Sequence, residues 1–286
     1  MRALVIGATG FTGSRVVPLL LGDYDVTCLV RPGSDASRLP VSTRRLTGSM
    51  DDRASLFEAM RGNEVLVCIA SIGFGHAPAL VAAARSAGIR RALFISTTAI
   101  FTSLNAGSKR ARVAAEESIA TSGIDWTVLR PTMIYGAAGD RNMERLIRYM
   151  QRWPVILVAG NGEHLQQPVH VDDVARAVAD ALRSPGTAGH AYNVSGAEPV
   201  TFNELIDTTA RLLGRRVRKL HVPLRPAVAL LRTFERAHLR LPIRAEQIER
   251  LNEDKAFPHH EAVRDFGFVT RTFAEGIAAE ISALRS

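Results

Sequence analysis

The sequence predicts an α/β fold: a doubly wound parallel sheet followed by a smaller, mostly helical C-terminal lobe. Three observations support this prediction. Short apolar runs alternate with helix-length stretches over the first two-thirds of the 286 residues. These runs do not alternate polar with apolar residues, which indicates strands buried on both faces of a sheet. A glycine-rich turn follows the first run directly.

The expected strands of the sheet are rich in β-branched residues and occur in order along the chain. They are residues 2–8, 25–30, a weaker run at 43–48, 64–71, 91–97 and 125–131. Helix-length stretches separate them, and two of these helices end in C-cap signals at Gly88 and Gly123. The sequential βα pattern requires crossover connections, which are typical of a parallel sheet.

After Gly136 the pattern loosens. We expect a helix entered through Asp140, a strand–turn–strand unit over 154–171, and a helix capped near Asp172. Thr201 begins another helix and has a glutamate three residues later, which predicts a capping box. The expected domains are a nucleotide-binding domain, 1–136 with parts of 166–196, and a substrate-binding lobe, 137–165 and 197–286.

The composition indicates a folded chain without membrane-spanning segments. Hydrophobic residues make up 47% of the sequence, and no apolar run approaches the roughly 20 residues of a membrane helix. The opening stretch MRALVIGATG lacks the pattern of a signal peptide, so we expect a cytoplasmic protein. Cys28 and Cys68 lie in apolar runs and are expected to be reduced core thiols. No Cys/His cluster has zinc-ligand spacing, so no metal is expected.

The net charge of +8 raises the question of a polyanionic partner. The basic residues are spread along the chain and mixed with acids. The densest cluster, residues 211–220, has no interleaved aromatic residues for base stacking, so we expect no nucleic acid partner. The remaining interpretations are a solvated basic face, an anionic substrate or a membrane surface.

The glycine-rich turn has the spacing GxxGxxG, from Gly7 through Gly10 to Gly13. Glycines at these positions allow a tight turn, a close approach of the backbone to a diphosphate, and close packing of the helix on the strand. The helix N-terminus then presents free N–H groups to the phosphates. In this βα context the motif predicts a dinucleotide-binding Rossmann domain, whereas the motif alone would be weak.

The end of the second strand predicts which nicotinamide cofactor binds. An acidic residue there holds the ribose hydroxyls of NAD, and a basic residue accommodates the 2′-phosphate of NADP. This sequence has Arg31, with Ser34 as a possible phosphate donor, so we expect NADP(H) rather than NAD(H). An ordinary exposed arginine is the alternative interpretation of Arg31.

Five segments together resemble the short-chain dehydrogenase/reductase superfamily, in its extended or atypical type. They are GATGFTG, VRPGSD, FISTTAIF, SGIDWTVLRPTMIYG and QQPVHVDDVARAVADAL, and the resemblance covers nearly the whole chain. This group includes NAD(P)-dependent epimerases and dehydratases and the NADPH-binding accessory subunit of respiratory complex I. The resemblance implies hydride transfer between nicotinamide C4 and a carbonyl or hydroxyl carbon.

The resemblance also implies roles for individual residues. The implied cofactor-binding residues are Gly7, Thr9, Gly10, Phe11, Thr12, Gly13, Arg31, Ser34, Ala70, Ser71, Lys109, Pro131 and Thr132. The implied catalytic group comprises Thr97, which would bond the substrate oxygen, and Lys109, which would bond the nicotinamide ribose. Tyr135 would flank the nicotinamide and is one candidate for the proton donor.

The sequence departs from the superfamily at its catalytic tyrosine. In active members a tyrosine stands four residues before the lysine, but here that position holds Asn105. Any proton donor must therefore be relocated, and the candidates are Thr97, Thr98, Ser103, Tyr135 or a water held by Asn105. Lys109 itself is catalytic, a cofactor contact without catalysis, or an exposed first-turn lysine.

The leading hypothesis is an NAD(P)-dependent oxidoreductase or epimerase-like enzyme acting on a small molecule. One alternative is a non-catalytic NADPH-binding sensor or scaffold. Another is a membrane-peripheral reductase of a lipid-like or quinone-like substrate, with the arginine-rich residues 223–247 either covering that substrate or lying on the membrane. By analogy alone, the helices near 75–88 and 107–122 would form a homodimer interface.

Overall fold

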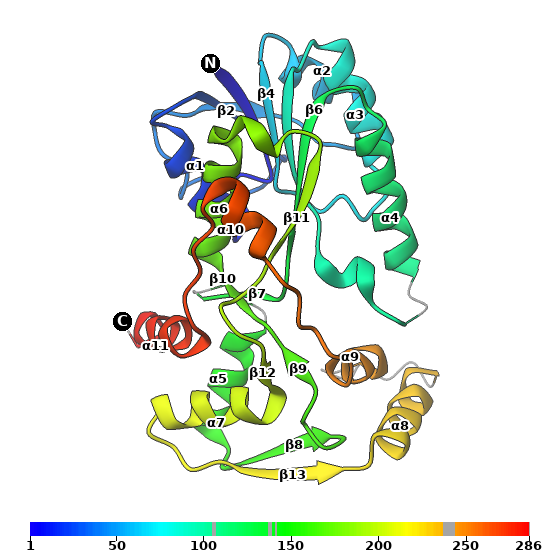
Figure 1. The fold of residues 1–286 in the computed structure, drawn as a ribbon, viewed down its shortest axis with the longest axis vertical. Helices are drawn as coiled ribbons and strands as arrows, with labels where there is room; N and C mark the ends of the chain where they lie inside the picture. The colour runs from blue at the N-terminus through cyan, green and yellow to red at the C-terminus, as the bar shows by residue number, and fades with distance from the viewer. Residues whose placement is uncertain (105–106, 137–138, 141, 237–243, 286) are drawn as a thin grey trace.

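The computed structural model describes residues 1–104, 107–136, 139–140, 142–236 and 244–285. Within this part, seven parallel strands form one sheet in the order β11-β6-β5-β4-β1-β2-β3 (Figure 1). The strands are β1 (Arg2–Ile6), β2 (Asp25–Val30), β3 (Arg44–Thr47), β4 (Val65–Cys68), β5 (Arg91–Ile95), β6 (Asp125–Pro131) and β11 (His190–Val194). The predicted doubly wound fold is confirmed. The strand order reverses between β1 and β4, where such sheets bind nucleotides.

Helices cover both faces of the sheet (Figure 1). One face carries α1 (Gly13–Leu20), α6 (Val171–Arg183) and α10 (His260–Phe266), and the other carries α2 (Arg53–Met60), α3 (Ala77–Ser86) and α4 (Gly107–Ala120). Successive β1 residues divide between the two cores: Ala3 and Val5 enter the first, Leu4 and Ile6 the second. Burying each large aliphatic side chain contributes about 1.5–3 kcal/mol, which explains the unbroken apolar run.

The lobe forms at the carboxyl edge of the sheet around a third core. Its helices are α5 (Met143–Arg152), α7 (Phe202–Leu212), α8 (Leu224–Arg236), α9 (Ala245–Leu251) and α11 (Phe273–Ala283). Its short strands pair as β7 (Ile134–Tyr135) with β10 (Val169–His170), β8 (Val155–Ala159) with β13 (Arg218–Val222), and β9 (Leu165–Gln166) with β12 (Val200–Thr201). The 3-10 helices η1 (Thr98–Phe101) and η2 (Pro185–Thr187) complete the elements.

The strands expected within residues 154–171 are present, and their pairing partners lie elsewhere in the lobe. The two strands either side of Gly160 and Gly162 do not form a hairpin, although both glycines have the positive φ of a turn. Strand β8 pairs in parallel with β13, and β9 pairs with β12. Turn chemistry acts locally, whereas the partner of β8 lies some sixty residues further along the chain and left no local signal.

Other expectations have mixed outcomes. The capping box of Thr201 and Glu204 is confirmed. Helix α6 begins earlier than expected, with His170 rather than Asp172 as its N-cap. Helix α10 packs on β11 and α6 in the sheet domain, although the sequence assigned it to the lobe.

Two further findings concern the cysteines and the hydropathy of the helices. Cys28 and Cys68 are buried free thiols, as expected, and burial raises their pKa values to about 11 and about 12. Among the described residues, no helix has both the length and the hydropathy needed to cross a bilayer.

Candidate functional site

The turn between β1 and α1 is packed so tightly that Gly7 and Gly13 cannot bear a side chain without displacing backbone. Gly7 has a φ of +85°, and a Cβ there would lie 2.7 Å from the Ala70 nitrogen at the end of β4. A Cβ on Gly13 would lie 2.1 Å from the Gly7 oxygen. The amides of Ile69 and Ala70 both donate to the Ile6 carbonyl, at 2.9 and 3.3 Å, which holds the ends of β1 and β4 together.

The start of α1 leaves backbone donors free. The first backbone hydrogen bonds of the helix run from Ser14 to the Gly10 oxygen and from Val16 to the Thr12 oxygen, at 3.0 and 3.1 Å. The amides from Phe11 to Gly13 precede these bonds, and the Thr12 side chain makes no capping bond. Unsatisfied N–H groups at a helix N-terminus favour an anion. This turn therefore has the geometry of a diphosphate site.

Arg15 is a residue of this site that sequence reasoning missed. Its guanidinium donates to the Phe11 carbonyl at 2.8 Å and lies 4.9 Å from the centre of the Phe11 ring. It also pairs with Asp172 of α6 at 3.1 Å. A basic residue two positions after the last glycine of the motif, in the first turn of the expected helix, was the available signal.

The loop after β2 presents the residues expected to choose the cofactor. Arg31 is exposed, and no ion pair holds its guanidinium among the described residues. The Ser34 amide donates to the Arg31 carbonyl at 3.0 Å, which makes a turn. Asp35 accepts from the Ser37 amide at 2.9 Å, and that bond lowers the pKa of Asp35. Arg31 thus remains available to an anion from solution, whereas Asp35 is occupied within its own loop.

The predicted residues at the carboxyl ends of β5 and β6 come together. Thr97 accepts a hydrogen bond from the Ala99 amide at 3.2 Å and caps η1, so its hydroxyl hydrogen remains available. Thr98 donates to the Pro131 carbonyl at 3.4 Å, and Thr132 donates to the Gln167 carbonyl at 2.5 Å. The first bond joins the ends of β5 and β6, and the second joins the end of β6 to the segment between β9 and β10.

Lys109 lies on the first turn of α4 and donates to the Thr102 carbonyl at 2.6 Å. Glu253, from the lobe, accepts from the Thr102 hydroxyl at 2.6 Å and from the Ser103 amide at 2.8 Å. Burial raises the pKa of Glu253, but the hydrogen bonds from Ser103 and Thr102 together outweigh it, so the net shift is downward. An ionised Glu253 therefore ties the loop before α4 to the lobe.

Lys255 lies two residues after Glu253, in the segment that connects α9 to α10. Its ammonium donates to the Arg250 carbonyl and lies 3.5 Å from the side-chain oxygen of buried Gln166. Burial lowers the pKa of Lys255 to about 8. Sequence reasoning missed both Glu253 and Lys255. Lysine occurs only at positions 109, 219 and 255, and that scarcity was the signal that pointed to Lys255.

Tyr135 is buried in the lobe core, where it cannot reach a substrate as a proton donor. It is 1% exposed, and its hydroxyl donates to the Phe273 carbonyl at 3.4 Å within the lobe core. Burial raises its pKa above that of a free phenol. A side chain enclosed in this way supports the lobe, since α11 packs directly on it. Asn105, which occupies the position of the superfamily's tyrosine, lies outside the described residues.

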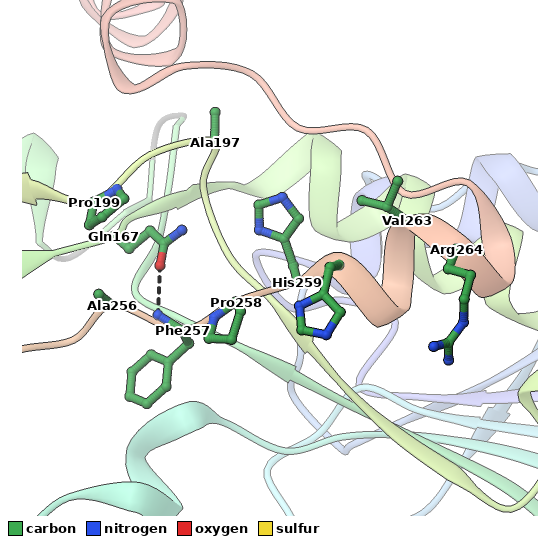
Figure 2. A pocket seen from close by; sticks show the side chains of 10 residues that line it. Gln167, Ala197, Pro199, Ala256, Phe257, Pro258, His259, Val263 and Arg264 are labelled. Atoms are coloured by element: carbon green, nitrogen blue, oxygen red, sulfur yellow. Dashed lines mark hydrogen bonds between the residues drawn. The ribbon is translucent and has the colours of Figure 1, made fainter.

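An open cavity of about 550 Å³ lies beside Gln167, close to the carboxyl end of β6 (Figure 2). Its walls are mostly apolar and come from the loop after β11 and from residues 256–264. Gln167 connects it to the site, because its side-chain oxygen accepts from the Phe257 amide at 2.7 Å while its carbonyl accepts from Thr132. Phe257 in turn contacts Phe101 of η1, with ring centres 5.5 Å apart.

Comparison with known proteins agrees with this geometry. A family model described as NAD(P)H-binding matches residues 7–185. The chain is 28% identical over 181 residues to NADH dehydrogenase [ubiquinone] 1 alpha subcomplex subunit 9, mitochondrial, of Arabidopsis thaliana, covering 62% of this chain and 45% of that protein. It spans 62% of the Dictyostelium discoideum protein of the same name. Thus the chain covers about half to three-fifths of the length of these relatives.

A shorter relative matches over more of its length. The chain is 28% identical over 222 residues to (4-alkanoyl-5-oxo-2,5-dihydrofuran-3-yl)methyl phosphate reductase of Streptomyces griseus, covering 75% of each chain. Among solved structures, the UDP-glucose 4-epimerase of Thermus thermophilus in complex with NAD aligns over 100% of this chain and 99% of its own, at 20% identity and a TM-score of 0.78. With the fold, the glycine turn and the family match over residues 7–185 in agreement, the chain belongs to the NAD(P)H-binding proteins of the extended short-chain dehydrogenase/reductase type.

Proposed function

We propose that the protein is an NADP(H)-dependent oxidoreductase that transfers a hydride to or from a carbonyl or hydroxyl carbon of a small molecule. The observation that carries this proposal is the β1–α1 turn, in which Gly7 and Gly13 cannot bear side chains and the amides precede the first helical hydrogen bond. Arg31, exposed and without an ion pair among the described residues, is the proposed partner of the 2′-phosphate. Bound NADPH would supply the hydride.

The residues at the ends of β5 and β6 are the proposed substrate site. Thr97 retains a hydroxyl hydrogen that can be donated to a substrate oxygen, because its own oxygen accepts the η1 capping bond. Lys109 and Glu253 both bond to Thr102 and hold the loop before α4 at residues 102 and 103. Their proposed role is to position this loop over the cofactor.

Lys255 is the proposed proton donor in place of the tyrosine, because its ammonium lies beside Gln166, the neighbour of the Gln167 whose carbonyl accepts from Thr132 at the end of β6. Its pKa of about 8 is close to that of a useful general acid at neutral pH, whereas the pKa of Tyr135 is raised by burial. In the reduction the substrate oxygen would receive the ammonium proton as its carbon receives the hydride. Lys255 would then be reprotonated from solvent, since its side chain is only partly buried.

A non-catalytic NADPH-binding protein is the second candidate. It is favoured by Asn105 at the tyrosine position and by the Lys109 ammonium, which is bonded to the Thr102 carbonyl. A relative named as a respiratory-complex subunit is compatible with either role.

Turnover and binding measured on the same samples separate the two candidates. The enzyme proposal expects NADPH oxidation with some member of a carbonyl panel, a rate that falls as pH rises through about 8, and loss of that rate in Lys255→Met. Lys255→Arg should lose the rate as well, because a guanidinium keeps its proton and cannot donate it to the substrate oxygen. Tight NADPH binding without turnover on any carbonyl would instead support the non-catalytic protein, and no binding of either nucleotide would refute both.

A further inference from the structure

The positive charge of this protein is concentrated in two segments of the lobe. Residues 145–162 and 208–234 contain ten of the 36 Lys and Arg residues and none of the 28 Asp and Glu residues. The rest of the chain carries 26 basic and 28 acidic residues and is therefore close to neutral. The net charge of the whole molecule is thus a property of these 45 residues.

The two segments lie together at one end of the molecule. They comprise most of α5 and all of β8, then the end of α7, β13 and most of α8, and β8 pairs with β13. This end lies opposite the seven-stranded sheet (Figure 1). Three of the ten basic side chains pair with a carboxylate: Arg148, Lys219 and Arg232. The others have no carboxylate partner among the described residues: Arg145, Arg152, Arg211, Arg215, Arg216, Arg218 and Arg225.

Large apolar side chains are exposed among these arginines. Leu157 and Leu220 are register partners on the β8–β13 ribbon and are 64% and 51% exposed. Trp153, which leads into β8, is 52% exposed, and Tyr149 stands one helical turn before it. Leu230 of α8 is 56% exposed. Five of the thirteen exposed large apolar residues of the described chain therefore lie in these two segments.

We propose that this end of the lobe, the basic–apolar end, docks on an anionic phospholipid bilayer. Unpaired arginines would neutralise headgroup phosphates, while the leucines and Trp153 would enter the boundary between headgroups and acyl chains. The proposal is independent of the enzymatic function. It also differs from the expectation that residues 223–247 alone form a membrane surface, because the ribbon and the end of α5 supply most of the apolar anchors.

The apolar residues distinguish a membrane from a nucleic acid. A nucleic acid backbone would use the same arginines, and Trp153 or Tyr149 could stack on a base. Leu157, Leu220 and Leu230 would gain nothing there, since aliphatic side chains neither stack nor bind phosphate. Exposed leucines paired across the ribbon can instead bury their side chains at the boundary between headgroups and acyl chains.

Co-sedimentation of the full chain with vesicles tests the proposal. We expect binding to vesicles of phosphatidylcholine and phosphatidylglycerol in equal parts, and little to phosphatidylcholine alone. Each Lys or Arg near an anionic surface contributes about fivefold to partitioning, so Arg215→Gln/Arg216→Gln/Arg218→Gln should weaken binding about 100-fold. The matched control, Arg44→Gln/Arg85→Gln/Arg110→Gln, removes three exposed arginines of the sheet domain and should bind as the wild type does.

The apolar contribution has its own readout. The protein has two tryptophans, so in Trp126→Phe the emission reports Trp153 alone and should shift to the blue on anionic vesicles. Leu157→Thr/Leu220→Thr should lower partitioning about tenfold and leave NADPH binding intact. Equal weakening by both arginine triples, no shift of Trp153, or binding to duplex DNA without binding to vesicles would overturn the proposal.

Discussion

Gly13 offers the sharpest test of the phosphate turn. An alanine Cβ there would lie 2.1 Å from the Gly7 oxygen and 2.9 Å from the Ala8 carbonyl carbon, whereas ordinary contact begins near 3.4 Å. Both neighbours are backbone, so the turn must open by about 1 Å. Overpacking of this kind costs about 1–3 kcal/mol of stability. It also moves the amides of Phe11 to Gly13, and misplacement of polar groups by about 1 Å can cost up to about 100-fold.

We therefore expect Gly13→Ala to raise the Kd for NADPH by about 10- to 100-fold, measured by calorimetric titration, and to lower the Tm. Gly22→Ala is the matched control, because it lies just beyond the same helix and its Cβ would meet nothing within 4 Å. The control should keep the wild-type Kd. A Gly13→Ala protein that binds NADPH normally, or a control that loses as much affinity, would refute the assignment of this turn to the diphosphate.

Three other predictions address stability and cofactor choice. Asp173 is fully buried and pairs with Arg271 at 2.9 Å, so Asp173→Asn should lower the free energy of unfolding by about 3–5 kcal/mol in urea titrations; a loss below about 1 kcal/mol would contradict this. Burial raises the pKa of Glu280 from 4.5 to about 8, so its contribution to stability is full below pH 4.5 and is lost as pH rises through 8. The Tm of Glu280→Gln should therefore fall less than that of the wild type as pH rises through 8. An equal fall of Tm in the two proteins would contradict this role of Glu280. Arg31→Asp should weaken NADPH binding at least about tenfold and leave NADH binding nearly unchanged, whereas equal losses would remove Arg31 from the 2′-phosphate site.

The sheet domain could be predicted because its signals are local. Each central strand is buried on two faces, so it must be apolar throughout, and Ala3 to Ile6 show this directly. The glycines of the phosphate turn are fixed by contacts within one βα unit and with the end of β4. Local constraints of this kind leave a pattern in the sequence even without knowledge of the rest of the fold.

The substrate side depends on contacts between distant segments, which leave no such pattern. Glu253 and Thr102, which are hydrogen-bonded, are 151 positions apart in the sequence. Tyr135 is enclosed by α11, which lies near the C-terminal end of the sequence. The sequence therefore left Tyr135 as one candidate proton donor and gave no reason to place Glu253 beside the loop or Lys255 beside Gln166. Only the tertiary arrangement changes the chemistry expected of each.

The position of α11 has a consequence for biosynthesis. Its residues Phe273, Ile277 and Ile281 complete the lobe core together with Ile147 and Leu205, which are made much earlier. A nascent chain can therefore assemble most of its sheet on the ribosome while the lobe still exposes apolar surface. Termination before residue 273 would leave that surface permanently uncovered, and such a fragment should be held by chaperones and degraded even though its nucleotide-binding turn is intact.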